Sequence, residues 1–188
     1  MRRRAYLWIS LLWVLLVVAI ALLSKPFGDF YRVPIIRTGE TLARLAVPAG
    51  VRVAIQDEGE EIAFVVGRGD NGLTMRITVG VFNASAAVFI ATVLLTPLGS
   101  VGRRALWTAL GLAGFVLFMG LVMAGLTLEP LVKGGLLSSR IAWRLAALAH
   151  NASTSNLIIS FPAALWFLST LPWWRRGFER PGERRGTR

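Results

Sequence analysis

The hydrophobic pattern of the chain is dominated by four long apolar runs, residues 5–24, 80–98, 106–126 and 156–173. None of the four runs contains a charged residue. Because an α-helix rises about 1.5 Å per residue, about 20 residues cover the roughly 30 Å hydrocarbon core of a bilayer. The pattern therefore predicts four transmembrane helices.

The first run has an alternative interpretation as a cleaved signal peptide. Such a peptide has an apolar core of about 7–15 residues, followed by small residues at the cleavage site. Here the apolar run is longer, and the segment that follows it, Ser24-Lys25-Pro26-Phe27, is a poor cleavage site. We therefore expect residues 1–24 to be a retained N-terminal anchor.

Between the first two apolar runs, the pattern changes to short segments of strand character. Residues 51–55 and 73–79 alternate apolar and polar side chains, and residues 62–66 are mostly apolar. Segments rich in glycine and acidic or amide residues separate them and suit turns. The pattern predicts a three-stranded meander of about 30 residues, which is too small for a core of its own. Before it, Pro34 and Pro48 bracket a predicted short helix.

Together these elements predict an α-helical integral membrane protein with about four transmembrane helices and a small extracytoplasmic β meander. The expected division of the chain is an anchor (1–24), an extracytoplasmic segment with the short helix and the meander (25–79), a three-span membrane region (80–174) that includes an outer amphipathic helix (136–151), and a basic cytoplasmic tail (175–188).

The distribution of charge predicts how the chain is oriented. The net charge is +11, and arginines cluster at residues 2–4, at Arg103-Arg104 and in the tail at residues 175–188. Short flanks rich in Lys and Arg remain cytoplasmic, so both termini and the 103–104 loop are expected inside a bacterial cell. This predicts a multi-pass protein of the bacterial inner membrane. Because the basic excess is explained by topology, nucleic acid is not an expected partner.

The composition also limits the chemistry that is available to the chain. It contains no cysteine, so thiol nucleophiles, disulfides and cysteine metal sites are excluded. Its single histidine, His150, cannot build a classical zinc site. We therefore predict no metal and no cofactor, and we expect membrane lipids among the partners because 55% of the residues are hydrophobic.

Polar side chains in the apolar runs have a structural and a functional interpretation. Ser85, Thr92 and Thr96 share one helical stripe, where hydroxyls usually bond a carbonyl one turn back or join a neighbouring helix. Asn83 lies at the outer end of the same run and suits an N-cap or a strand-to-helix junction, or a contact in a functional pocket. Small residues in the third run predict helix packing, within the bundle or at a dimer seam, at Gly111, Gly114, Gly120 and Ala124.

Residues 136–151 predict an amphipathic helix that follows a break at Gly134-Gly135. Its apolar face is expected to hold Leu137, Ile141, Leu145 and Leu148 and to lie flat on the outer membrane surface. Arg140 and Arg144 on another face would meet solvent, lipid headgroups, or the carboxylate or phosphate of a partner. His150 is either an interfacial side chain or a proton-transfer group.

The order of these polar groups resembles that of exosortases and archaeosortases, which are multi-span membrane proteins. That family carries an outer-face cysteine at the start of a span, then an arginine, then a histidine. Here the corresponding order is Asn83-Ala-Ser85, then Arg140 or Arg144, then His150. Because the cysteine is absent, the thiol chemistry of the family does not carry over.

A second resemblance is to the exosortase H-associated membrane proteins, small companions with an N-terminal span, an outer strand segment and a following span. The residues that carry it are 72–79, running into Phe82-Asn83 and on to residues 95–97. This resemblance implies an accessory role beside an exosortase that processes proteins at the inner membrane.

Three functional hypotheses follow. The first is a non-enzymatic accessory subunit of an exosortase-type sorting or export system. The second is a divergent membrane transpeptidase or protease that uses Ser85, His150 and an arginine such as Arg140. The third, a small transporter subunit, is disfavoured because the predicted spans contain no charged residue.

Overall fold

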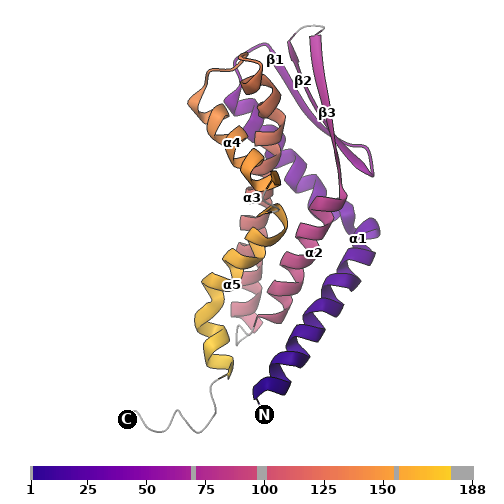
Figure 1. Ribbon diagram of the computed structural model, residues 1–188, viewed down its shortest axis with the longest axis vertical. Helices are drawn as coiled ribbons and strands as arrows, with labels where there is room; N and C mark the ends of the chain where they lie inside the picture. Colours follow the sequence, from indigo (N-terminus) through magenta and orange to yellow (C-terminus); the bar gives the residue numbers. More distant parts are fainter. Residues whose placement is uncertain (1, 69–70, 97–100, 155–156, 179–188) are drawn as a thin grey trace.

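A computed structural model of the chain describes residues 2–68, 71–96, 101–154 and 157–178. Five helices and one sheet make up the described part (Figure 1). The sheet and α4 lie at one end of the molecule, whereas the starts of α1 and α3 and the ends of α2 and α5 lie at the other. In chain order the elements are α1 (Arg2–Ala46), β1 (Val51–Asp57), β2 (Glu61–Arg68), β3 (Asn71–Thr78), α2 (Gly80–Leu95), α3 (Val101–Lys133), α4 (Arg140–Thr154) and α5 (Leu157–Phe178).

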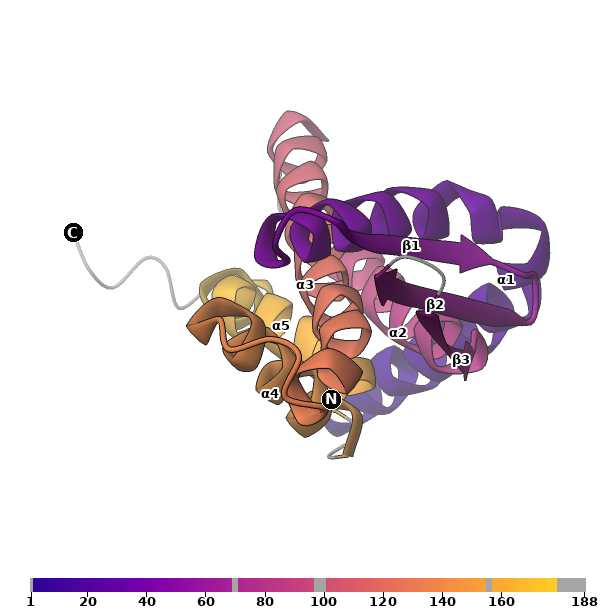
Figure 2. The ribbon, with the colours of Figure 1, turned by 90° about the horizontal axis from the view of Figure 1, so that it is seen from above.

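The predicted three-stranded meander is confirmed. The strands are antiparallel in the order β1-β2-β3, with Ile55 opposite Phe64 and Phe64 opposite Met75. Gly59 adopts a φ of 88° in the β1–β2 turn, a conformation that favours glycine. Seen from above, the sheet lies alongside the upper part of α1 (Figure 2).

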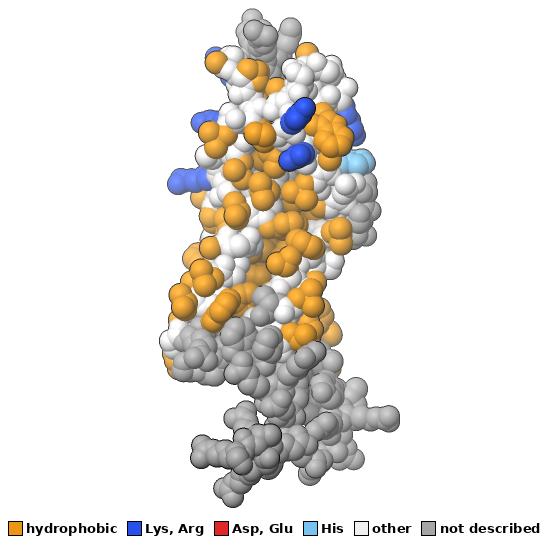
Figure 3. All heavy atoms as spheres, turned by 90° about the vertical axis from the view of Figure 1, so that its left-hand side faces the viewer, with side chains coloured by type: hydrophobic (Ala, Val, Ile, Leu, Met, Phe, Trp, Pro, Cys, Tyr) orange, Lys and Arg blue, Asp and Glu red, His pale blue; other side chains and the backbone are white. Residues whose placement is uncertain are grey.

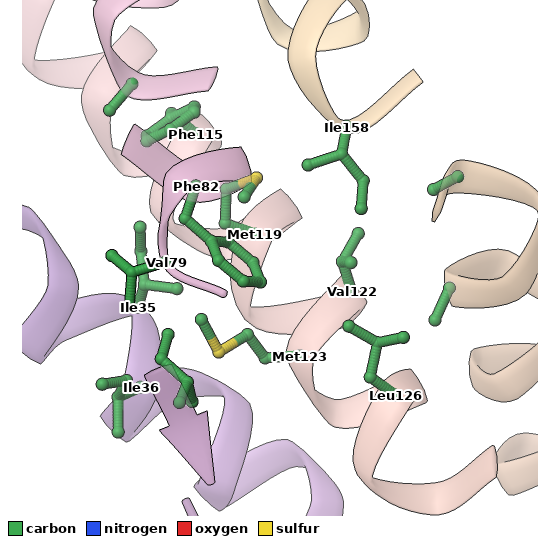
Figure 4. Packing of buried hydrophobic residues seen from close by; sticks show 14 of the residues in the cluster. Ile35, Ile36, Val79, Phe82, Phe115, Met119, Val122, Met123, Leu126 and Ile158 are labelled. Atoms are coloured by element: carbon green, nitrogen blue, oxygen red, sulfur yellow. The ribbon is translucent and has the colours of Figure 1, made fainter. Parts of the chain in front are cut away.

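The sheet shares its core with the helices. Phe64 and Ile62 of β2 are buried in one cluster with Ile35 of α1, Phe82 of α2 and Met119 of α3. Figure 4 shows how Ile35, Phe82 and Met119 converge from three helices. The meander therefore depends on apolar side chains outside its own sequence, as the sequence predicted.

The predicted fold class of a four-span helical membrane protein was wrong. Among the described residues, one helix is long and apolar enough to cross a membrane, Ala105–Lys133, which includes the third predicted span. The apolar helical segments at the second and fourth spans, Phe82–Leu95 and Leu157–Leu168, are shorter. The 16 residues of α2 extend only about 24 Å, less than the hydrocarbon core. Residues 5–24 are helical as part of α1, but many of their side chains lie outside the described residues.

The described residues therefore form five helices packed with a three-stranded antiparallel sheet. The predicted separate helix after Pro34 was also wrong, because α1 continues through this proline and ends at Ala46, just before Pro48. The break at Gly134-Gly135 is confirmed: α3 ends at Lys133, and Gly135 has a φ of 70°.

The predicted packing role of the hydroxyl stripe is confirmed. Thr92 accepts a hydrogen bond from Trp13 Nε1 of α1 at 3.2 Å, and Thr96 accepts one from Trp166 Nε1 of α5 at 2.8 Å. Both threonines also donate to a carbonyl one turn back. The stripe, which includes Ser85, joins α2 to its neighbours on both sides.

Small residues of α3 allow close helix crossings at some of the predicted positions. A Cβ atom on Gly120 would lie 2.6 Å from Thr38 Cγ2 of α1, and one on Gly111 would lie 2.2 Å from the Trp166 ring of α5. Ala124 is fully buried. Gly114, in contrast, has open space around it, so it takes no part in close packing within the chain.

Candidate functional site on helix α4

Ser85 is completely buried at the start of α2. Its Oγ donates a hydrogen bond to the carbonyl of Ile158 in α5 at 2.6 Å, and it lies 3.8 Å from Met119 Sδ. The hydroxyl proton is therefore engaged with a backbone acceptor rather than with a base. This arrangement matches a helix-packing group.

Asn83 connects α2 to α1. Its Oδ1 accepts a hydrogen bond from the Tyr31 hydroxyl, and α2 begins three residues earlier at Gly80 without a side-chain cap. Burial raises the pKa of the Tyr31 hydroxyl above its ordinary value of 10.0, although the nearby Arg32 guanidinium opposes this. Asn83 is thus a junction residue, and the N-cap interpretation was wrong.

His150 lies over the end of α3, where the sequence did not lead us to expect an acidic partner. Its Nδ1 is 3.1 Å from Glu129 Oε1, and the same oxygen is 2.6 Å from Lys133 Nζ. The Glu129 side chain is only 15% exposed, whereas that of His150 is 51% exposed. This cluster joins α4 to α3 through the contact of the His150 ring with the Glu129 carboxylate. An isolated glutamate at the end of a long apolar run was the signal that could have identified it.

The buried face of α4 differs from the predicted one. Alanines 142, 146, 149 and 152 are buried, while Ile141 and Leu148 are exposed. The small face packs tightly on α3, because a Cβ atom on Gly125 would lie 2.1 Å from the Leu145 carbonyl oxygen. Gly125 was not among the glycines predicted to pack helices. Of the predicted apolar face, Leu137 is buried whereas Ile141 and Leu148 face outward, and the position of α4 on a membrane surface stays a prediction.

The outward face of α4 combines basic and apolar side chains. Arg140, Trp143 and Arg144 are exposed, and with Leu137 and Ser138 they line a shallow hollow of about 330 Å³. Arg140 and Arg144 are four residues apart, so their side chains lie on the same side of the helix. We call this surface, formed by Arg140, Ile141, Trp143, Arg144 and Leu148, the α4 face.

Figure 3 shows basic side chains beside an aromatic ring at the upper end of the molecule, with the single histidine nearby and an extensive apolar surface below. The structure thus gathers Arg140, Arg144 and His150 on one helix. It places Ser85 and Asn83 elsewhere, in the contacts of α2 with α5 and α1. Within the described residues, no group of three or more His, Cys, Asp or Glu side chains is arranged to hold a metal ion.

Comparison of the chain with models of known protein families, with curated proteins and with solved structures finds no match. The assignment of function therefore depends on the geometry of the molecule and on its sequence.

Replacing Ser85 by alanine tests the packing role. We expect Ser85→Ala to leave biological activity near that of the wild type and to cost about 1 kcal/mol of stability, because one buried hydrogen bond is lost. His150→Ala should have a separate and mild effect, since it removes a contact to Glu129. Activity of both variants and of the double variant should be measured at matched protein levels. Complete loss in each single variant with no further loss in the double would indicate a nucleophile and its base.

Proposed function

We propose that this protein is a non-enzymatic accessory subunit of an inner-membrane protein-sorting system of the exosortase type. The observation that carries the proposal is the α4 face, an exposed surface on which two arginines flank a tryptophan over a shallow hollow. Exposed tryptophan and arginine are typical of residues that dominate binding energy in protein interfaces. The link to exosortases comes from the order of polar groups along the chain.

In the part of the chain that the structure describes, one helix, α3, is long and apolar enough to cross a membrane. Within its most apolar stretch, 44% of the residues are buried, and the others are half-buried or exposed. Leu106, Leu110 and Leu117 are among its exposed side chains. An apolar surface of this kind requires lipid or another protein to cover it. We assign α3 to the inner membrane for this reason.

The orientation of α3 follows from its flanks. Arg103-Arg104 lies in the first turn of α3, at the end of the molecule where α1 begins and α5 ends. By the positive-inside rule, this end is cytoplasmic, and the sheet and the α4 face lie outside.

Single cysteines in this cysteine-free chain test the orientation. Thr74→Cys on β3 should react with a membrane-impermeant thiol reagent in cells whose outer membrane has been made permeable. Gly102→Cys, at the other end, should react only after the inner membrane is opened. Both positions are exposed in the folded chain, so burial does not explain a difference. Equal labelling of both in intact cells would contradict the assignment.

The α4 face would recognise an anionic group on the partner. Arg140 and Arg144 can pair with a carboxylate, while Trp143 and Ile141 add apolar contact beside them. A binding role of this kind requires no covalent chemistry from the described side chains. The hydroxyl of Ser85, which the enzymatic hypothesis requires, is buried and bonded to Ile158.

Reversal of charge on the α4 face tests the proposal. Arg140→Glu with Arg144→Glu should weaken co-purification with the exosortase-type enzyme of the same organism by roughly tenfold or more. The matched control is Arg52→Glu, an exposed arginine on β1. Membrane levels of all variants should stay equal. Wild-type binding by the double reversal, or no co-purification of the wild type, would overturn the proposal.

A further inference from the structure

Strand β3 is an open edge of the sheet. The strand order is β1-β2-β3, so β3 pairs with β2 on one side, and no described element pairs with its other side. The opposite edge differs, because α1 packs along β1 and Arg44 Nε lies 3.4 Å from the Val53 carbonyl oxygen. In an antiparallel edge strand, alternate residues direct their backbone N–H and C=O groups outward. Such an edge is a template for another strand.

The β3 edge also lacks the devices that usually block strand addition. It is eight residues long, contains no proline and carries one charged residue, Arg76. That charge is matched within the chain, because Arg76 Nε lies 3.0 Å from Glu58 Oε2 and 3.7 Å from Glu61 Oε2. Leu73 near the start of the strand is 54% exposed. Proteins normally protect long edges with Lys, Pro, bulges or a covering element.

We propose that the outer edge of β3 binds an extended segment of another protein by strand addition. Main-chain hydrogen bonds would supply the affinity, and side chains alternating along the edge would supply selectivity. Leu73, Met75 and Ile77 lie on one face of the strand, and Thr74, Arg76 and Thr78 lie on the other. The partner is therefore a segment of about six to eight residues that alternates apolar and hydroxyl side chains.

Charge identifies which end of the partner is basic. Glu61 lies directly opposite Thr78, so the acidic β1–β2 turn flanks the C-terminal end of β3. Glu58 and Glu61 are exposed here, and both share the single arginine of β3, Arg76. A lysine or arginine of the partner next to Thr78 would restore the balance.

A second copy of the chain fits the edge less well. Figure 1 shows β3 running roughly along the long axis of the molecule. Copies with the same orientation in one membrane could therefore pair β3 only in parallel. Parallel pairing would bring the two turns with Glu58 and Glu61 together, which places like charges side by side.

The test uses the full-length protein in detergent micelles and two fluorescein-labelled octapeptides. Both peptides alternate threonine and valine. One carries two lysines at its C-terminus, and the other carries two lysines at its N-terminus. We expect one of the two peptides to bind, as measured by fluorescence polarisation. Because its lysines should lie next to Thr78, the peptide that binds shows whether the added strand is parallel or antiparallel to β3. N-methylation of every second peptide bond should weaken binding at least about tenfold, because the methyl groups remove the ladder donors.

Protein variants make the result specific to β3. Thr74→Lys places a charge on the exposed edge and should weaken binding of the lysine-bearing peptide at least about tenfold. Thr41→Lys, at an exposed threonine of α1, is the matched control and should bind like the wild type. Equal binding of the N-methylated peptide, no binding of either octapeptide, or unchanged binding by Thr74→Lys would each overturn the inference. The assay involves neither the α4 face nor an exosortase, so its outcome is independent of the proposed function.

Discussion

Gly125→Ala should destabilise the protein by about 3 kcal/mol, although it adds a single methyl group. The added Cβ would lie 2.1 Å from the Leu145 carbonyl oxygen and 2.6 Å from Ala149 Cβ. Both atoms belong to α4, and a backbone oxygen cannot rotate away as a flexible side chain can. Relief of the overlap requires α4 to move off α3, which exposes the buried alanines of α4. Overpacking of this kind costs typically about 1–3 kcal/mol and sometimes more.

The matched control is Gly114→Ala on the same helix. No atom lies within 4 Å of a Cβ at this position, so the substitution only improves helix propensity. It should stabilise the protein by up to about 1 kcal/mol. Thermal unfolding of both variants in the same detergent checks the pair. Equal shifts of the two melting temperatures would contradict the close crossing of α3 and α4.

Arg32→Met should release the sheet from α1 and cost about 2–4 kcal/mol. Arg32 is buried, and its Nη1 lies 3.1 Å from Asp57 Oδ1 and 2.9 Å from the Gly59 carbonyl oxygen. Asp57 also accepts a hydrogen bond from the Gly59 backbone N–H, so the ion pair ties α1 to the β1–β2 turn, which a backbone bond from Glu58 N–H to the Glu61 carbonyl also closes. Loss of one partner leaves a carboxylate that is only 24% exposed without its counter-charge.

Cleavage by a glutamate-specific protease provides the measurement, because Glu58, Glu60 and Glu61 lie in or beside this turn. The Arg32→Met variant should be cut there much faster than the wild type. Arg37→Met is the control, since Arg37 is exposed on the same helix. Similar cleavage rates in the two variants would show that the ion pair does not secure the turn.

Local sequence patterns were sufficient for the strands and for several helix boundaries. Alternation in residues 51–55 and 73–79 places apolar side chains on one face, and a strand requires only that pattern and a turn at each end. Glycines at 134 and 135 end α3 for a similarly local reason, because they favour conformations that a helix cannot continue.

The candidate site was predicted only in part. Arg140, Arg144 and His150 were identified from their positions on one amphipathic helix, and they do lie on α4. The contact of His150 with Glu129 joins residues 21 positions apart, and no local pattern encodes it. The same holds for Tyr31 and Asn83, which are 52 positions apart.

The sequence alone determined the three strands, the break between α3 and α4, which residues are chemically available, and that the hydroxyl stripe of α2 joins helices. Only the tertiary structure decided that α4 buries its alanines and exposes Ile141, Leu148 and its arginines. The physical reason is that α4 approaches α3 closely at Gly125, and only small side chains fit between two helices at that distance. An amphipathic pattern predicts which side chains share a face, but the shape of the neighbouring helix selects the face that is buried.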